Sequence, residues 1–191
     1  ELARLGALSV PSALRITAGL LDALTAVHER GVVHADIKAD NVFCTDERLV
    51  MLLDFGAARR SGVAPRSGEP RVGTPRSMAP EQFDEAALDP STDTYAVGLL
   101  LYELLVGEGP FEGRAESHDD FRRAHARLPP PAPSTRALQV VPSAIDGVVL
   151  RALAKRPKDR YASAAEMLED LSVAARRRID GDETVEALSG Y

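Results

Sequence analysis

The chain has 191 residues, of which 45% are hydrophobic, and this is enough apolar material for one substantial core. Its formal net charge of −6 argues against a general nucleic-acid binder. A single cysteine excludes an internal disulfide and, with no apolar run or leader that suggests a membrane span or export, predicts a cytoplasmic location.

The first half of the chain is expected to contain one long helix and a small β region. Residues 1–11 are interpreted as a linker. From Ser12, leucines recur at helical intervals, so we expect a helix that Ser12 caps and Gly31 ends. Three short strands follow, at residues 32–33, 42–44 and 49–53, and the polar residues 45–48 should turn the last two into a hairpin.

The second half is expected to be helical. Residues 92–106 are apolar on most sides and are followed by Gly107, which predicts a buried central helix. Ser117 should start a polar helix ending near Leu128. The proline-rich residues 129–133 cannot be helical and should be extended. Two capping-box patterns predict the last helices, and they begin at Ser143 and Ser163.

The stretch from His34 to Asn41, followed by Asp54-Phe55-Gly56, has the residue types that phosphoryl transfer requires. A carboxylate at Asp36 can orient an attacking hydroxyl, and the Lys38 ammonium can approach the transferred group. Asn41 and Asp54 offer oxygen ligands of the kind that Mg²⁺ prefers. Taken alone, Asp36 could instead be a turn or helix cap, and Lys38 could be only a solvated charge.

These residues carry a family resemblance. The pattern His34-x-Asp36-x-Lys38-x-x-Asn41 resembles the catalytic loop of the eukaryotic-type, bacterial-like Ser/Thr protein kinases, and Asp54-Phe55-Gly56 resembles their metal-binding triplet. Further matches follow in the family's order, and these are Gly73-Thr74-Pro75, Ala79-Pro80-Glu81, Asp93-x-Tyr95-x-x-Gly98 and Arg160. A single tripeptide would be weak evidence, but an ordered set makes coincidence negligible.

The resemblance implies a fold that is mainly α with a small β-hairpin region. This is the fold of the large, C-terminal lobe of a protein kinase. The lobe is expected at residues 12–175, after a linker at 1–11 and before a polar, disordered tail at 176–191. Nothing upstream of the first helix resembles the family's glycine-rich loop, strand lysine or partner glutamate. We therefore expect the N-terminal lobe to be missing from this chain.

The resemblance also implies a role for each matched residue. Asp36 and Lys38 are the expected catalytic residues, Asn41 and Asp54 the ligands of Mg²⁺ or Mn²⁺, and Thr74 the residue of the substrate loop. Phe43, Leu53 and Lys38 are expected to bind ATP, although Phe43 is explained equally well as ordinary core. The matched residues with structural roles are His34, Phe55, Gly56, Glu81, Asp93 and Arg160.

Some of these roles imply specific contacts. Glu81 and Arg160 should form a buried ion pair, and Asp93 should accept hydrogen bonds from the backbone of the catalytic loop. Thr74 should bond Asp36 and Lys38. Without a small lobe above them, Phe43, Leu53 and Phe55 should form a partly exposed apolar patch.

One departure from the family concerns Ala35, which stands where many members have an arginine that pairs with a phosphate on the activation segment. We therefore expect activity to depend weakly on phosphorylation of this segment. The segment contains several hydroxyl and arginine side chains, which we interpret as solvated rather than as a preformed anion site: Ser61, Ser67, Thr74, Ser77, Arg59, Arg60, Arg66, Arg71 and Arg76.

Three functions stay open at this point. The first is a Ser/Thr protein kinase that transfers the ATP γ-phosphoryl group to protein hydroxyls, with its small lobe elsewhere in a longer parent or in another chain. On that reading the isolated chain should be weakly active or inactive. The second is a non-catalytic binding or scaffold module, and the third is a truncated relic. The intact set Asp36, Lys38, Asn41 and Asp54 favours the first.

Overall fold

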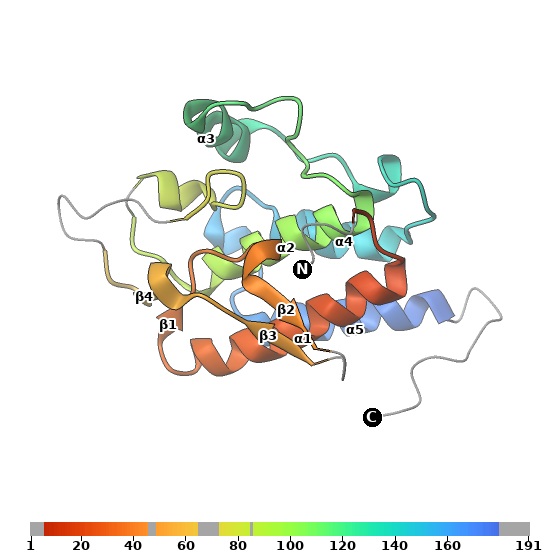
Figure 1. Ribbon diagram of the computed structural model, residues 1–191, viewed down its shortest axis with the longest axis horizontal. Coiled ribbons are helices and arrows are strands. Elements are labelled where there is room, and N and C mark those ends of the chain that lie inside the picture. The colour runs from red at the N-terminus through yellow and green to blue at the C-terminus, as the bar shows by residue number, and fades with distance from the viewer. Residues whose placement is uncertain (1–5, 46–48, 65–72, 85, 180–191) are drawn as a thin grey trace.

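The computed structural model describes residues 6–45, 49–64, 73–84 and 86–179. Helix α2 runs through the middle of the molecule, α1, α4 and α5 pack around it, and α3 lies at one edge (Figure 1). The helices are α1 Val10–His28, α2 Pro90–Val106, α3 His118–Arg127, α4 Ser143–Ala152 and α5 Ala164–Ile179. The expected architecture, mainly helical with a small β region, is present.

The strands form two small antiparallel sheets. Strands β2 (Val42–Cys44) and β3 (Val50–Leu52) make the expected hairpin, in which Phe43 lies opposite Met51. The central residues of its predicted turn, 46–48, lie outside the described residues. Strand β1 (Val32–Val33) pairs instead with β4 (Arg59–Arg60), a strand that the sequence did not predict because two arginines give no apolar alternation.

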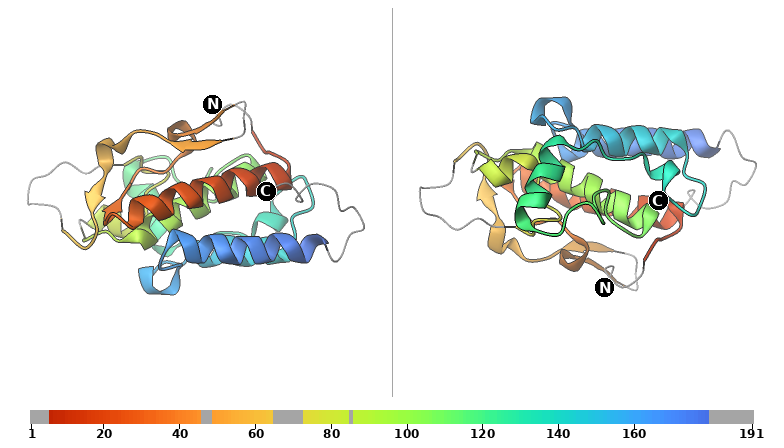
Figure 2. Two further views of the ribbon diagram at one scale, coloured as in Figure 1. Left: turned by 90° about the horizontal axis from the view of Figure 1, so that it is seen from below. Right: turned by 90° about the horizontal axis from the view of Figure 1, so that it is seen from above.

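Helix α1 begins at Val10, earlier than the predicted start at Ser12. Pro11 lies in its first turn, where a proline's fixed φ angle suits a helix and its missing N–H is not needed. The helix lies between the β2–β3 hairpin and α5 (Figure 2). Gly19 makes the close approach to β3 possible, because a Cβ there would lie 2.8 Å from Val50 Cγ2.

The sequence expectation about membrane spans needs correction at α1. By length and composition alone, this helix would be long and apolar enough to cross a bilayer. Its side chains Leu20, Leu21 and Leu24 are nevertheless fully buried among the other helices of the domain. This is the environment of a core helix, so its apolar character is explained by packing inside the fold.

Helix α2 forms the centre of the core. The Asp89 carboxylate accepts a hydrogen bond from Ser91 N at 2.8 Å and caps the helix start, which lies slightly before the predicted residue 92. Gly107, with φ +93°, ends the helix as predicted. Nearly every side chain between these ends is buried, which matches an apolar pattern without a polar face.

Gly98 is the point of closest contact between α2 and α4. A Cβ at this position would lie 2.7 Å from Ala152 Cβ and 3.2 Å from Leu153 Cδ2. Gly98→Ala should therefore destabilise the domain by about 1–3 kcal/mol through overpacking, despite the better helix propensity of alanine. Urea unfolding measures this, and Gly147→Ala on α4 is the control, because a Cβ there meets nothing within 4 Å. Equal stability of the two variants would contradict the prediction.

Several boundaries in the C-terminal half differ from those predicted. Ser163 caps the start of α5 as predicted, since its hydroxyl accepts from Glu166 N at 3.1 Å. Ser143 does not cap α4, because Asp146 bonds Ser134 N at 2.9 Å instead. The prolines are not extended throughout, since Pro133 begins a short 3₁₀ turn. Residues 176–179 belong to α5 and not to a disordered tail, and the rest of the predicted tail lies outside the described residues.

Candidate active site

The loop between β1 and β2 carries the predicted catalytic residues Asp36 and Lys38, and both contact Thr74 of the predicted substrate loop. Lys38 Nζ lies 2.8 Å from Asp36 Oδ2 and 2.7 Å from Thr74 Oγ1. Thr74 donates to Asp36 Oδ1 through its backbone nitrogen at 3.1 Å and its hydroxyl at 3.2 Å. The expected contacts of Thr74 with Asp36 and Lys38 are therefore present, and they join two segments that are distant in sequence.

The Asp36 carboxylate lies in an environment that favours its charged form. Partial burial raises its pKa, but hydrogen bonding and charge from Lys38, the Thr74 N–H and the Asn41 amide together outweigh this effect. The pKa of Asp36 therefore lies below its ordinary value, and the group is ionised at neutral pH. Its share of the folding stability is complete above the unfolded pKa and is lost as the pH falls through the folded pKa.

The two predicted metal ligands, Asn41 and Asp54, are brought near each other by a backbone hydrogen bond between their segments. Asn41 uses its amide nitrogen, which donates to Asp36 O at 2.8 Å and Oδ2 at 3.1 Å, so its amide oxygen is the atom suited to a cation. Asp54 accepts from Gly56 N through Oδ1 at 3.0 Å and is otherwise exposed. Leu53, next to Asp54, donates its N–H to Asn41 O at 2.8 Å.

This donor set fits a hard divalent cation held partly by phosphate oxygens. Two protein oxygens are too few for a metal site built by protein alone, and the described residues contain no cluster of three His, Cys, Asp or Glu side chains suited to a metal. Mg²⁺ commonly takes one or two carboxylate or amide ligands and completes its coordination with water and substrate phosphates.

His34 and Phe55 pack beneath the loop. His34 is fully buried, its Nε2 lies 3.0 Å from Leu53 O, and its ring meets the Phe55 ring edge-on at 4.8 Å. Asp36 N donates to His34 Nδ1 at 3.3 Å. These contacts engage both ring nitrogens, so the imidazole is placed to support the loop rather than to transfer a proton.

Asp93, at the start of α2, holds the loop from the other side. Its fully buried carboxylate accepts from His34 N and Ala35 N, each at 2.8 Å, as expected for a buried acid that needs backbone donors. It also lies 2.8 Å from His28 Nε2. His28 was not predicted as a site residue, although its helical spacing from Leu21 and Leu24 placed it on the buried stripe of α1.

The residues expected to form a partly exposed apolar patch lie beside this loop. Phe43, Leu53 and Phe55 are exposed by 45%, 44% and 48%, as expected for residues without a cover. Met51, opposite Phe43 on the hairpin, extends the surface and was not predicted. We call these four side chains the hairpin patch.

The predicted ion pair between Glu81 and Arg160 is present and bidentate. The Nη1–Oε1 and Nη2–Oε2 distances are 2.7 and 2.8 Å, and the Arg160 side chain is completely buried. Thr92 Oγ1 donates to Glu81 at 2.9 Å, and the Arg160 guanidinium lies over the Tyr95 ring. The pair therefore fixes the turn Pro80–Asp84 against the core.

The arginines expected to be solvated behave differently from one another. Arg59 donates to Ala57 O and Ala58 O, and Arg76 pairs with Glu112 at 2.9 Å, so neither is simply solvated. Arg60 is exposed. Three further members of the predicted segment, Arg66, Ser67 and Arg71, lie outside the described residues.

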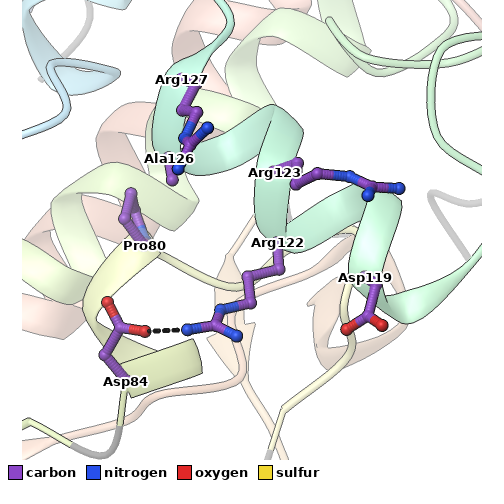
Figure 3. A pocket seen from close by; sticks show the side chains of 7 residues that line it. All are labelled: Pro80, Asp84, Asp119, Arg122, Arg123, Ala126 and Arg127. Carbon is purple, nitrogen blue, oxygen red and sulfur yellow. Dashed lines mark hydrogen bonds and ion pairs between the residues drawn. The ribbon is translucent and has the colours of Figure 1, made fainter.

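A cavity of about 440 Å³ lies apart from this site, between α3 and the turn Pro80–Asp84. Its walls carry both charge signs, and Arg122 pairs with Asp84 across it at 2.9 Å (Figure 3). None of the predicted ATP-binding residues lines it. The open hairpin patch and the Asp36 loop are therefore better candidates for nucleotide binding than this cavity.

Comparison with known proteins agrees with this arrangement. Residues 2–171 match the family model described as protein kinase domain. The chain is 39% identical over 180 residues to the serine/threonine-protein kinase Pkn1 of Myxococcus xanthus. The aligned region includes 90% of this chain and 25% of that protein. It is 37% identical over 169 residues to the serine/threonine-protein kinase PknB of Mycolicibacterium smegmatis, with 87% of this chain and 27% of the relative covered.

A helical domain with this loop, this hairpin and this buried ion pair is of the protein kinase type. The chain belongs to the protein kinase domain family. It spans only about a quarter of the length of these curated relatives.

Proposed function

We propose that the chain is the large, C-terminal lobe of a Ser/Thr protein kinase, and that it transfers the γ-phosphoryl group of ATP to Ser or Thr hydroxyls of protein substrates. The observation that carries this proposal is the convergence of Asp36, Lys38, Asn41 and Thr74 in one hydrogen-bonded network. A binding module has no physical need for an ionised carboxylate and an ammonium group held together with an amide and a hydroxyl.

In the proposed reaction the substrate hydroxyl oxygen forms a bond to the γ-phosphorus as the bond to the bridging oxygen of ADP breaks. Asp36 orients the hydroxyl and accepts its proton, and its ionised state at neutral pH suits it to this role. Lys38 offers positive charge to the phosphoryl oxygens. Thr74, through its bonds to both, sets the position of the substrate chain.

We propose that Asn41 and Asp54 hold Mg²⁺, with Mn²⁺ as an alternative. The metal, when bound, would neutralise phosphate charge. The protein's part is to present two oxygen ligands at fixed positions. Asn41 does so through its amide contacts with Asp36, and Asp54 through its bond to Gly56 N.

The hairpin patch supports a second part of the proposal. We infer that Phe43 and Leu53 contact the adenine base, and that a small lobe supplied by the rest of the parent protein covers the patch. The exposure of four large apolar side chains beside Asp36 supports a cover of this kind. On this view the described domain supplies the floor of the nucleotide site, and its catalytic activity depends on the covering lobe.

A transfer assay with radiolabelled ATP and a generic protein substrate tests this function. We expect the full-length parent protein to label Ser or Thr residues, and the 191-residue chain alone to show little or no turnover. Adding Mg²⁺ back after chelation should restore the activity of the full-length protein. If the full-length protein labels nothing with either Mg²⁺ or Mn²⁺, the kinase proposal is wrong and a scaffold role is left.

A further inference from the structure

Gln82 is a buried amide that the proposed mechanism does not use. It lies in the turn Pro80–Asp84, only 7% of its surface is exposed, and both ends of its side chain are bonded. Its Nε2 donates to Ala35 O at 2.8 Å, and its Oε1 accepts from Ala79 N at 2.8 Å. One side chain therefore links the end of the activation segment to the residue before Asp36.

The bond from Gln82 acts on a backbone position that needs support. Ala35 has φ +64°, in the left-handed region that a residue with a Cβ rarely adopts. Asp93 holds the N–H of Ala35, and Gln82 holds its carbonyl. The carbonyl belongs to the Ala35–Asp36 peptide unit, whose N–H donates to His34. Gln82 and His34 therefore fix that peptide plane from its two sides.

The same bond also contacts the start of the substrate loop. A Cβ at Gly73 would lie 3.3 Å from both Ala35 O and Gln82 Nε2, so the chain passes directly over this hydrogen bond before reaching Thr74. The Gln82 side-chain amide thus lies where three segments meet, and these are the catalytic loop, the substrate loop and the turn Pro80–Asp84. Glu81, the neighbour of Gln82, anchors that turn to the core through Arg160.

We propose that Gln82 is a positioning residue, which sets the orientation of Asp36 by coupling the end of the activation segment to the catalytic loop. The coupling uses an uncharged amide and backbone atoms, so it needs no phosphate on the segment and no cation at Ala35. It would therefore serve in place of the charge-based ordering that an arginine at position 35 is expected to give. This inference rests on the proposed kinase function.

Two substitutions in the full-length protein separate the bonds. Gln82→Met keeps the unbranched shape and removes both bonds. Gln82→Glu keeps an acceptor for Ala79 N–H but sets a carboxylate against Ala35 O. We expect kcat to fall by about 10²-fold in both, because misplacing a reacting group by about 1 Å has that effect, while KM for ATP stays unchanged. The control is Gln139→Met, at the only other glutamine of the chain.

Gln139 is a matched control because its amide also bonds backbone atoms, at Leu8 O, Leu105 O and Val10 N, away from the Asp36 loop. Adding Ala35→Gly to Gln82→Met should restore part of kcat, since glycine adopts positive φ without strain. Equal losses of kcat in Gln82→Met and Gln139→Met, or no rescue, would overturn the proposal.

Hydrogen exchange keeps this test independent of the kinase assay. The backbone amides of Ala35 and Asp36 should exchange faster in Gln82→Met than in the wild type and in Gln139→Met. Unchanged exchange at these amides would exclude the coupling, whatever the activity. If the wild-type protein transfers no phosphoryl group but exchange is faster in Gln82→Met, the kinase proposal fails while the structural coupling stands.

Discussion

Asp36→Asn should reduce phosphoryl transfer by the full-length protein by about 10²–10⁴-fold, the range found for removal of a general base. The asparagine side chain has nearly the same shape, and its one oxygen can still accept from Thr74. Asn41 loses its bond to Oδ2 but still donates to Asp36 O, so the loop should keep its geometry. What is lost is the negative charge that Lys38 now balances and the capacity to accept a proton. Single-turnover kinetics with saturating ATP measure the effect.

Asp40→Asn is the matched control for this variant. It makes the same chemical change in the same loop, but Asp40 is exposed and lies outside the network of Asp36. We expect its transfer rate to equal that of the wild type. Equal losses in the two variants would mean that the loop's net charge, and not the position of Asp36, determines the rate. The role proposed for Asp36 would then be wrong.

Removing one partner of the Glu81–Arg160 pair should destabilise the domain by about 3–5 kcal/mol, because the other charge is left buried and uncompensated. We expect Arg160→Met to be more damaging than removal of the Glu81 carboxylate, since the guanidinium also donates to Ala154 O and Lys155 O. Replacing both partners, Glu81→Leu with Arg160→Met, should recover a large part of the loss. Urea unfolding of Glu81→Gln, Arg160→Met and the double variant measures these differences.

The exposed pair between Asp84 and Arg122 provides the comparison. Its N–O distance of 2.9 Å is similar, but about half or more of each side chain is exposed. Asp84→Asn should therefore cost less than about 1 kcal/mol. If this variant and Glu81→Gln unfold at the same urea concentration, burial does not determine the strength of the Glu81–Arg160 pair.

The sequence predicted those parts of the site that are local in the chain. Asp36, Lys38 and Asn41 fall in one short loop, so their spacing alone placed them near one another. The contacts of Thr74, Asp93 and Arg160 join distant segments, and only the family resemblance indicated them. No such information existed for Gln82, because its bonds to Ala35 and Ala79 depend on how the turn folds back over the loop.

Errors at element boundaries have local causes. The Ser143 pattern satisfies a capping rule, yet Asp146 bonds Ser134 from another segment, so a tertiary contact prevailed over the local preference. Strand β4 forms because Arg59 and Arg60 lie beside β1, and pairing between backbones needs no side-chain pattern. His28 was not among the predicted site residues, although its place on the α1 stripe predicted burial. Its acidic partner, Asp93, lies on α2.

The hairpin patch has a consequence for handling the protein. A ligand that binds only the folded state stabilises it in proportion to the logarithm of its concentration over its dissociation constant. If adenine covers Phe43 and Leu53, ATP should act as a folding ligand and also shield the surface through which separate chains would otherwise associate. Supplying nucleotide during purification would then raise the melting temperature and lower the tendency of the domain to precipitate.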